Sequence, residues 1–112
     1  MLAVHGDGGF LMNVQELETA VRHRINAVTL VMNNNCWGSE KAYQRAYYGG
    51  RYIGCDIGNP RYDQLRAALR RGGLLRGGAG PDRRHTLRAA FAAGKPAVIE
   101  IPIDPDELPT PQ

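Results

Sequence analysis

Apolar residues in the first third of the chain occur in two short runs and, between them, at helical spacing. Residues 1–5 are a mainly apolar run that stops at a glycine-rich turn, GDGG, at 6–9, so a strand is predicted there. From Val14 to Ile25 the apolar positions recur every three or four residues, which is one face of a helix. Asn13 is the expected N-cap of this helix, which we expect to end at Asn26.

A second strand is expected directly after that helix. Residues 27–32 form a compact apolar and β-branched run, typical of a strand buried on both faces of a parallel sheet. A strand–helix–strand unit of this length predicts a right-handed crossover and parallel pairing. The fold class predicted by the sequence is therefore α/β.

Polar and glycine-rich segments separate the remaining predicted elements. The loop NNNCWG at 33–38 cannot continue a sheet, whereas 39–48 favours a short helix and 49–60 is loop with glycine and proline punctuation. Further elements are expected as helices at 61–71 and 84–93, with Gly94 ending the second, and as a last strand at 97–101.

Length and composition indicate one small globular domain. The chain has 112 residues, 43% hydrophobic and 22% charged, which is ordinary for a folded domain. We place this domain at 1–103 and expect a proline-rich tail at 104–112 that leaves it. No apolar run approaches the ~20 residues that span a bilayer, and no secretory leader is visible, so a cytoplasmic location and no membrane partner are expected.

Charge and cysteine content add little about function. Residues 66–85 contain six arginines and one aspartate, a net charge of +5, so the rest of the chain carries −2. This segment is broken by glycines and has no interleaved aromatic residues, which disfavours nucleic-acid binding. Cys36 and Cys55 lack the spacing of a zinc site and are expected to be free thiols.

Two unusual loops follow predicted strands and should therefore lie together. In an open parallel sheet, ligands bind beyond the carboxyl ends of the strands. Gly6 and Gly8 let backbone N–H groups approach an anion closely. Asp7 would repel a phosphate unless a cation lay between them, and Mg²⁺ favours one or two carboxylates together with phosphate oxygens. Asp7 is therefore a candidate metal ligand.

Asn34 offers a second oxygen ligand. Its amide oxygen is of the hard type that Mg²⁺ accepts, and a backbone carbonyl in the following loop would supply a third. Taken singly, a GDG turn or an NN pair is common in proteins without a metal. Only their combination is informative.

That combination resembles a known motif. GDGGF, MNVQEL on the helix, the strand VTLVM and the loop NNNCWG are similar to the binding motif of thiamine-diphosphate (ThDP) enzymes. The resemblance covers 6–38 and implies the C-terminal ThDP-binding domain, here incomplete. The resemblance implies that Mg²⁺ is bound by the side chains of Asp7 and Asn34 and by the backbone carbonyl of Cys36. It implies that the N–H groups of Gly8 and Gly9 contact the diphosphate. Trp37 and Gly38 would form the turn that closes over the diphosphate.

A narrower resemblance extends over 33–62. NNNCWGSEKAYQ and GGRYIGCDIGNPRY look most like the sulfoacetaldehyde acetyltransferase group among acetolactate-synthase-like enzymes. This implies acyl transfer or carbon–carbon bond chemistry on a small substrate of the 2-oxo acid or sulfoacetaldehyde type. Glu40 and Lys41 belong to the shared segment, but a solvated helix start explains them better than a substrate contact does.

The resemblance also implies missing parts. In the family, a glutamate from a separate pyrimidine-binding domain, usually on a neighbouring subunit, activates the cofactor, so the full-length protein is expected to be a homo-oligomer. The chain alone is expected to be inactive. The alternatives are a non-catalytic phosphate- or nucleotide-binding module and a truncated, inactive gene product.

Residues 66–85 depart from the family pattern. Relatives have an apolar helix, a turn and a short strand here, whereas this chain has RAALRRGGLLRGGAGPDRRH. The sequence predicts a missing strand and a gap in the sheet. One hypothesis is a pair of compensating frame shifts in GC-rich DNA; the alternative is a divergent solvent-exposed loop.

Overall fold

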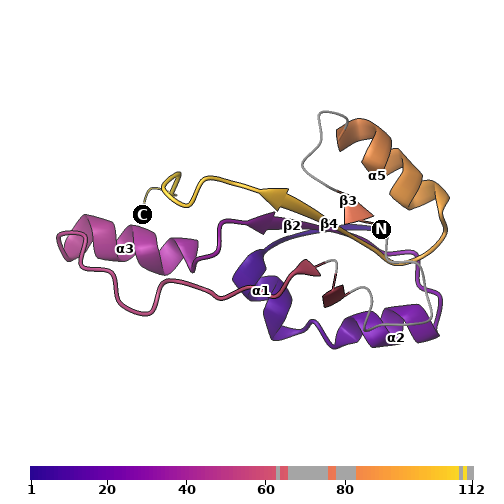
Figure 1. Cartoon of the computed structure of the whole chain (residues 1–112), viewed down its shortest axis with the longest axis horizontal. Helices are drawn as coiled ribbons and strands as arrows, with labels where there is room; N and C mark the ends of the chain where they lie inside the picture. Colours follow the sequence, from indigo (N-terminus) through magenta and orange to yellow (C-terminus); the bar gives the residue numbers. More distant parts are fainter. Residues whose placement is uncertain (63, 66–75, 78–82, 109, 111–112) are drawn as a thin grey trace.

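The chain folds around a parallel β-sheet with helices on both sides (Figure 1). The computed structural model describes residues 1–62, 64–65, 76–77, 83–108 and 110. The strands are β1 (Leu2–Gly6), β2 (Val28–Asn33), β3 (Arg76–Gly77) and β4 (Ala97–Pro102). They pair in the order β1-β2-β4-β3, every pair parallel. The predicted α/β class is confirmed, and the three predicted strands lie within one residue of their expected bounds.

A fourth strand corrects the expectation of a gap in the sheet. Arg76 and Gly77 pair with Val98 and Ile99 of β4, so at least two residues of the atypical segment take part in the sheet. Backbone hydrogen bonding of this kind does not depend on an apolar side chain, which is why the arginine- and glycine-rich sequence did not predict it. Residues 66–75 and 78–82, on which most of the frame-shift hypothesis rests, lie outside the described residues.

The glycine-rich segment after β1 is helical, not a turn. Helix α1 (Asp7–Met12) begins directly at the aspartate, with Gly6 as N-cap in an extended conformation. The prediction of a turn at 6–9 was therefore wrong beyond Gly6. Glycine has low helix propensity, but burial of Asp7, Gly8 and Phe10 gives this short helix tertiary support.

The predicted long helix is interrupted and shorter. Asn13 closes α1, and α2 (Glu16–Arg22) follows with Gln15 as N-cap, so the assignment of Asn13 as an N-cap was wrong. The helical spacing of apolar residues continues across the break between α1 and α2, because Val14 packs against the same core as Leu17 of α2. Within α2, Arg22 Nε lies 3.3 Å from Glu18 Oε1, an ion pair between residues four apart on the same face of the helix.

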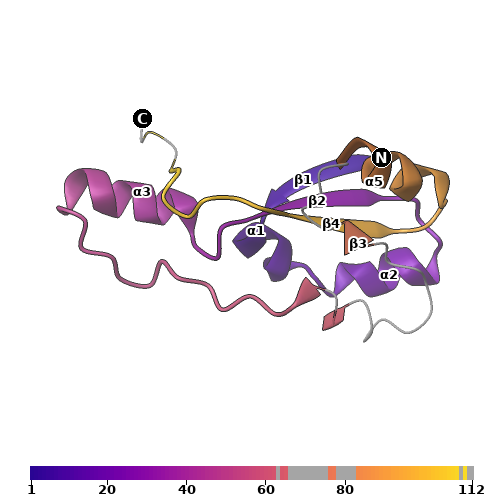
Figure 2. The ribbon, with the colours of Figure 1, turned by 45° about the horizontal axis from the view of Figure 1, so that its top comes forward.

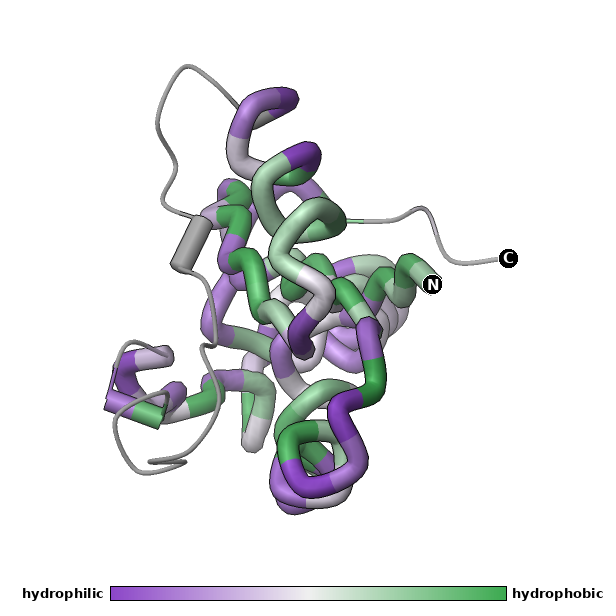
Figure 3. The backbone as a smooth tube through the Cα atoms, turned by 90° about the vertical axis from the view of Figure 1, so that its right-hand side faces the viewer, coloured by the Kyte–Doolittle hydropathy of each residue, from purple (hydrophilic) through white to green (hydrophobic). Residues whose placement is uncertain are grey.

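Two apolar cores lie on opposite faces of the sheet because successive side chains of a strand alternate. The face covered by α1 and α2 holds one core (Phe10, Val31, Tyr62, Val98). The face covered by α5 (Arg83–Ala92) holds the other (Val28, Ala90, Ala97, Ile99). The strands accordingly form the hydrophobic centre of Figure 3. Gly94, at φ +61°, follows α5 as predicted.

Helix α3 (Gly38–Tyr47) extends away from the sheet, beyond the end of β2 (Figure 2). The predicted tail at 104–112 does not leave the domain at once. Lys41 donates hydrogen bonds to the Pro105 carbonyl at 3.0 Å and to Asp106 at 3.1 Å, and Arg45 donates to the Asp106 carbonyl at 3.2 Å. Residues 105–106 therefore lie against α3.

None of the helices in the described part of the chain is both long and apolar enough to cross a bilayer.

Candidate functional site

Asp7 is the buried acid at the carboxyl edge of the sheet. It follows β1 directly, opens α1 and is only 2% exposed. A buried carboxylate requires compensation, and the positive end of α1 gives part of it. No side chain caps this helix.

The three asparagines after β2 surround the same edge. The Asn33 side chain accepts a hydrogen bond from the Asn35 backbone N–H at 3.0 Å, and that of Asn34 accepts one from the Cys36 N–H at 3.3 Å. Asn35 adopts a left-handed conformation with φ +55°, which asparagine tolerates better than most residues. Through these local bonds the loop folds back on itself.

Asn59 brings the two loops together. Its Nδ2 donates to Asp7 Oδ2 at 2.7 Å and to Asn33 Oδ1 at 2.7 Å, and it lies 3.0 Å from Asn35 Oδ1. The two loops predicted to share one edge are therefore joined through a third segment. Asn34, a predicted metal ligand, is in the neighbouring loop, but its oxygen bonds to the Cys36 N–H instead.

Trp37 lies over the start of α1. A Cβ atom added at Gly8 would lie 2.5 Å from Trp37 Cζ3, well inside van der Waals contact, whereas one added at Gly9 would meet nothing within 4 Å. Gly8 is therefore required for close packing of the indole on the helix start. At the next position, a Cβ on Gly38 would approach Asn34 Nδ2 at 3.4 Å.

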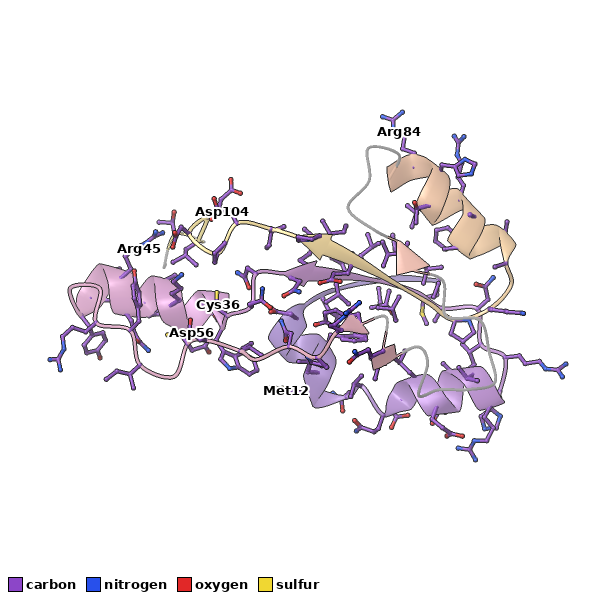
Figure 4. The ribbon with its side chains drawn as sticks, viewed as in Figure 1. Met12, Cys36, Arg45, Asp56, Arg84 and Asp104 are labelled. Carbon is purple, nitrogen blue, oxygen red and sulfur yellow. The ribbon has the colours of Figure 1, made fainter. Side chains whose placement is uncertain are left out.

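Cys36 is held by pairing with the segment that carries Asn59. Cys36 and Asp56 form an antiparallel bridge where β2 leads into α3 (Figure 4), and the Trp37 N–H donates to the Cys55 carbonyl at 2.7 Å. Cys36 and Cys55 are both buried free thiols, as expected. Burial raises the pKa of the Cys36 thiol, so the thiol is protonated at neutral pH and only the carbonyl is suited to a hard cation.

Sequence reasoning missed two polar residues under the site. Glu100 on β4 accepts a hydrogen bond from Asn33 Nδ2 at 2.7 Å. Tyr62 is 7% exposed, and its hydroxyl has no hydrogen-bond partner in the described part of the chain. Burial, with Asp7 and Glu100 nearby, raises the pKa of Tyr62 to about 12. Because side chains alternate along a strand, the position of Glu100 on the same face of β4 as Val98 could be predicted from the sequence. The packing of residues 59–62 against that face could not.

Neither Glu40 nor Lys41 forms a hydrogen bond with this cluster in the described part of the chain. The Glu40 carboxylate is exposed and bonds to the Ser39 hydroxyl at 2.8 Å. Lys41 bonds to Pro105 and Asp106 and lies 5.5 Å from the centre of the Tyr52 ring. The contacts of Lys41 are thus internal to the chain. Arg84, from the basic segment, lies on α5 far from Cys36 (Figure 4).

The donor set of the site suits a hard cation. The Asp7 carboxylate and the amide oxygens of Asn33 and Asn35 gather around Asn59 at this edge. Among the described residues, no group of three or more His, Cys, Asp or Glu side chains could hold a metal. Oxygen donors with few charges favour Mg²⁺ over zinc, which prefers nitrogen and sulfur. Asn59 Oδ1 is also buried without a partner. The residues present therefore fit Mg²⁺.

The sequence of the chain matches a known family. Residues 1–101 match the family described as thiamine pyrophosphate enzyme, C-terminal TPP binding domain. The chain is 35% identical over 105 residues to the acetolactate synthase large subunit of Mycobacterium tuberculosis, covering 94% of this chain and 19% of that protein. It is 30% identical over 103 residues to the sulfoacetaldehyde acetyltransferase of Alcaligenes xylosoxydans xylosoxydans, covering 89% and 17%. The chain thus spans about a fifth of the length of these relatives.

Solved structures support the fold. The benzoylformate decarboxylase of Polynucleobacter necessarius superposes with a TM-score of 0.81 at 23% identity, over 98% of this chain and 20% of that one. At this identity the likeness concerns the fold alone.

Proposed function

The chain belongs to the thiamine pyrophosphate enzyme family as its C-terminal TPP-binding domain, and we propose that it holds the diphosphate of that cofactor through Mg²⁺. Asp7, the Asn34 side chain and the Cys36 carbonyl are the proposed ligands. The observation that carries the proposal is the convergence of the buried Asp7 carboxylate with the asparagine loop at one sheet edge, where Asn59 bonds to both. Two diphosphate oxygens and a water would complete an octahedron.

The backbone around Asp7 supplies the anion contacts in this proposal. First-turn amides of a helix have no intrahelical acceptor, so the N–H groups of Gly8 and Gly9 are available to phosphate oxygens. Gly9 is exposed, and a side chain at Gly8 would displace the indole of Trp37. Trp37 and Gly38 form the turn that closes over the diphosphate.

The reaction itself needs more than this chain contains. When bound, the cofactor supplies a thiazolium ylid that attacks a carbonyl carbon; the residues of this chain position its diphosphate end. We propose an acyl-transferring or carbon–carbon bond-forming enzyme acting on a 2-oxo acid or sulfoacetaldehyde-type substrate, located in the cytoplasm. A pyrimidine-binding domain, from the same gene or another subunit of a homo-oligomer, would complete the pocket.

Titration of the chain with ThDP, in the presence and absence of Mg²⁺, tests this proposal. The chain contains a single tryptophan, Trp37, so fluorescence reports directly on the site, and calorimetry gives the affinity. We expect saturable binding that requires Mg²⁺ and is at least tenfold weaker for thiamine monophosphate. Metal-independent binding, or equal binding of ADP, would instead support a non-catalytic phosphate- or nucleotide-binding module.

A further inference from the structure

The Asn59 side chain has an unusual set of partners. Its single amide nitrogen lies within 3.0 Å of three oxygen atoms, from Asp7, Asn33 and Asn35. An amide nitrogen has only two hydrogens, so it cannot satisfy three acceptors fully. The other end of the same amide, Oδ1, is buried and has no hydrogen-bond partner among the residues that the structure describes.

The orientation of this amide follows from its strongest partner. An ionised aspartate only accepts hydrogen bonds, so the nitrogen and not the oxygen of Asn59 must face Asp7 at 2.7 Å. A positively polarised group thus lies amid three oxygens, one of them anionic. This is the electrostatic position that a cation would take.

We propose that Asn59 is an internal substitute for the cation, which holds the site together without metal and is displaced from Asp7 when Mg²⁺ binds. The proposal rests on the proposed metal site. A cation that ligates Asp7 competes with Asn59 for the only charged acceptor among its three oxygen partners. The Asn59 amide would then turn away from Asp7, and its oxygen, which accepts no hydrogen bond from the described residues, would become accessible to a donor.

The backbone around Asn59 favours rotation of the side chain over movement of the segment. The Ile57 N–H donates to the Asn35 carbonyl at 2.8 Å on one side. On the other side, the Tyr62 ring packs against the Phe10 ring, with 5.8 Å between the two ring centroids. Pro60 further restricts the Asn59 backbone to extended conformations. Exchange between amide and cation therefore needs only the Asn59 side-chain torsions.

Competition between amide and cation predicts opposite effects on stability and on metal affinity. Removing the amide in Asn59→Ala should lower the melting temperature in EDTA, because Asp7 loses its close donor. The same change should leave the affinity for Mn²⁺, a probe for Mg²⁺, unchanged or increase it. In Asn59→Asp a carboxylate faces Asp7, so we expect a still lower melting temperature in EDTA that Mn²⁺ restores, and tighter Mn²⁺ binding.

The experiment measures Mn²⁺ binding by electron paramagnetic resonance and melting temperature in EDTA for the 112-residue chain and both variants. Asn26→Ala is the control, because Asn26 bonds to the Phe91 carbonyl away from the site. A tenfold loss of Mn²⁺ affinity in Asn59→Ala would make Asn59 a ligand and overturn the proposal. An unchanged melting temperature in EDTA for both variants would also overturn it. Absence of Mn²⁺ binding by the unsubstituted chain would instead count against the metal site itself.

Discussion

At the scale of single residues, the site depends on how closely one side chain approaches the start of α1. The indole of Trp37 occupies the space that any Cβ at Gly8 would need, while the adjacent Gly9 faces open space. Both glycines belong to the same motif and the same helix. They therefore fulfil different physical requirements, close packing at Gly8 and backbone access at Gly9.

Gly8→Ala should lower the free energy of unfolding by about 1–3 kcal/mol, the usual cost of overpacking. Gly9→Ala should raise it by up to ~1 kcal/mol, because alanine favours a helix more than glycine does. Chemical denaturation measures both. In the double variant Gly8→Ala/Trp37→Ala, most of the cost of the alanine should disappear. Equal effects at the two glycines would contradict the packing argument.

Tyr62→Phe should stabilise the chain, by about 1 kcal/mol, because it removes a buried hydroxyl that has no partner. Burial raises the pKa of Tyr62 in the folded chain to about 12, whereas in the unfolded chain this pKa has its ordinary value of 10.0. The unfolded chain therefore loses this proton first as the pH rises. Relative to the phenylalanine variant, wild-type stability should be constant below pH 10 and fall between pH 10 and 12.

The tyrosinate absorbance of the wild-type chain minus that of Tyr62→Phe gives the folded-state titration directly. A step near pH 10 in this difference would show that the hydroxyl is solvated, and would refute the burial argument.

At the scale of elements, the described part of the tail is attached to α3 by hydrogen bonds. Lys41 links this helix to Pro105 and Asp106, and the hydrogen bond from Lys41 to Asp106 raises the pKa of the lysine. A raised pKa in the folded state means that this link is complete below pH 10.5 and is lost as the pH rises further. Asp106 is largely exposed, so its effect on global stability should be small.

Lys41→Met should therefore release the segment at 104–108 without unfolding the sheet. We expect faster hydrogen exchange and faster proteolysis there, with little change in the melting temperature. Arg22→Met is a matched control, because it breaks the exposed pair with Glu18 on the distant α2. Unchanged exchange at 104–108 in Lys41→Met would show that the contacts do not order the tail.

Sequence patterns predicted the elements that are regular over a whole segment. The runs that became β1, β2 and β4 and the helices α3 and α5 are apolar or periodic enough to be recognised. The break at 13–15 was invisible because Val14 keeps the helical spacing while the backbone leaves it. Helix α1 was missed because the burial that supports its glycines is a tertiary effect.

The candidate site was predictable only where its residues directly follow strands. Asp7 and the asparagine loop could be placed at one edge from topology alone. Asn59 and Tyr62 reach that edge through a long loop whose path is fixed by pairing at Cys36 and Asp56, and no local pattern encodes such a contact. The contact of Asn33 with Asn59 was not predicted, because the motif implies a role only for the neighbouring Asn34.

At the scale of the whole molecule, we propose that the chain is the cofactor-binding part of a larger catalytic unit. It spans about a fifth of the length of the relatives it matches, and the activating glutamate is proposed to lie on another domain. The purified chain should therefore show no turnover with pyruvate or sulfoacetaldehyde, even with ThDP and Mg²⁺. Product assays check this, and measurable acetyl transfer by the chain would contradict the division of the pocket between domains.

The most direct measurement of the central claim is calorimetric titration of ThDP into three variants at saturating Mg²⁺. Asp7→Ala and Asn34→Ala each remove a proposed metal ligand and should abolish Mg²⁺-dependent binding. Glu18→Ala removes an exposed acid of α2 that forms an ion pair with Arg22, and this variant should bind ThDP as the unsubstituted chain does. Unchanged affinity and metal dependence in Asp7→Ala would contradict the account.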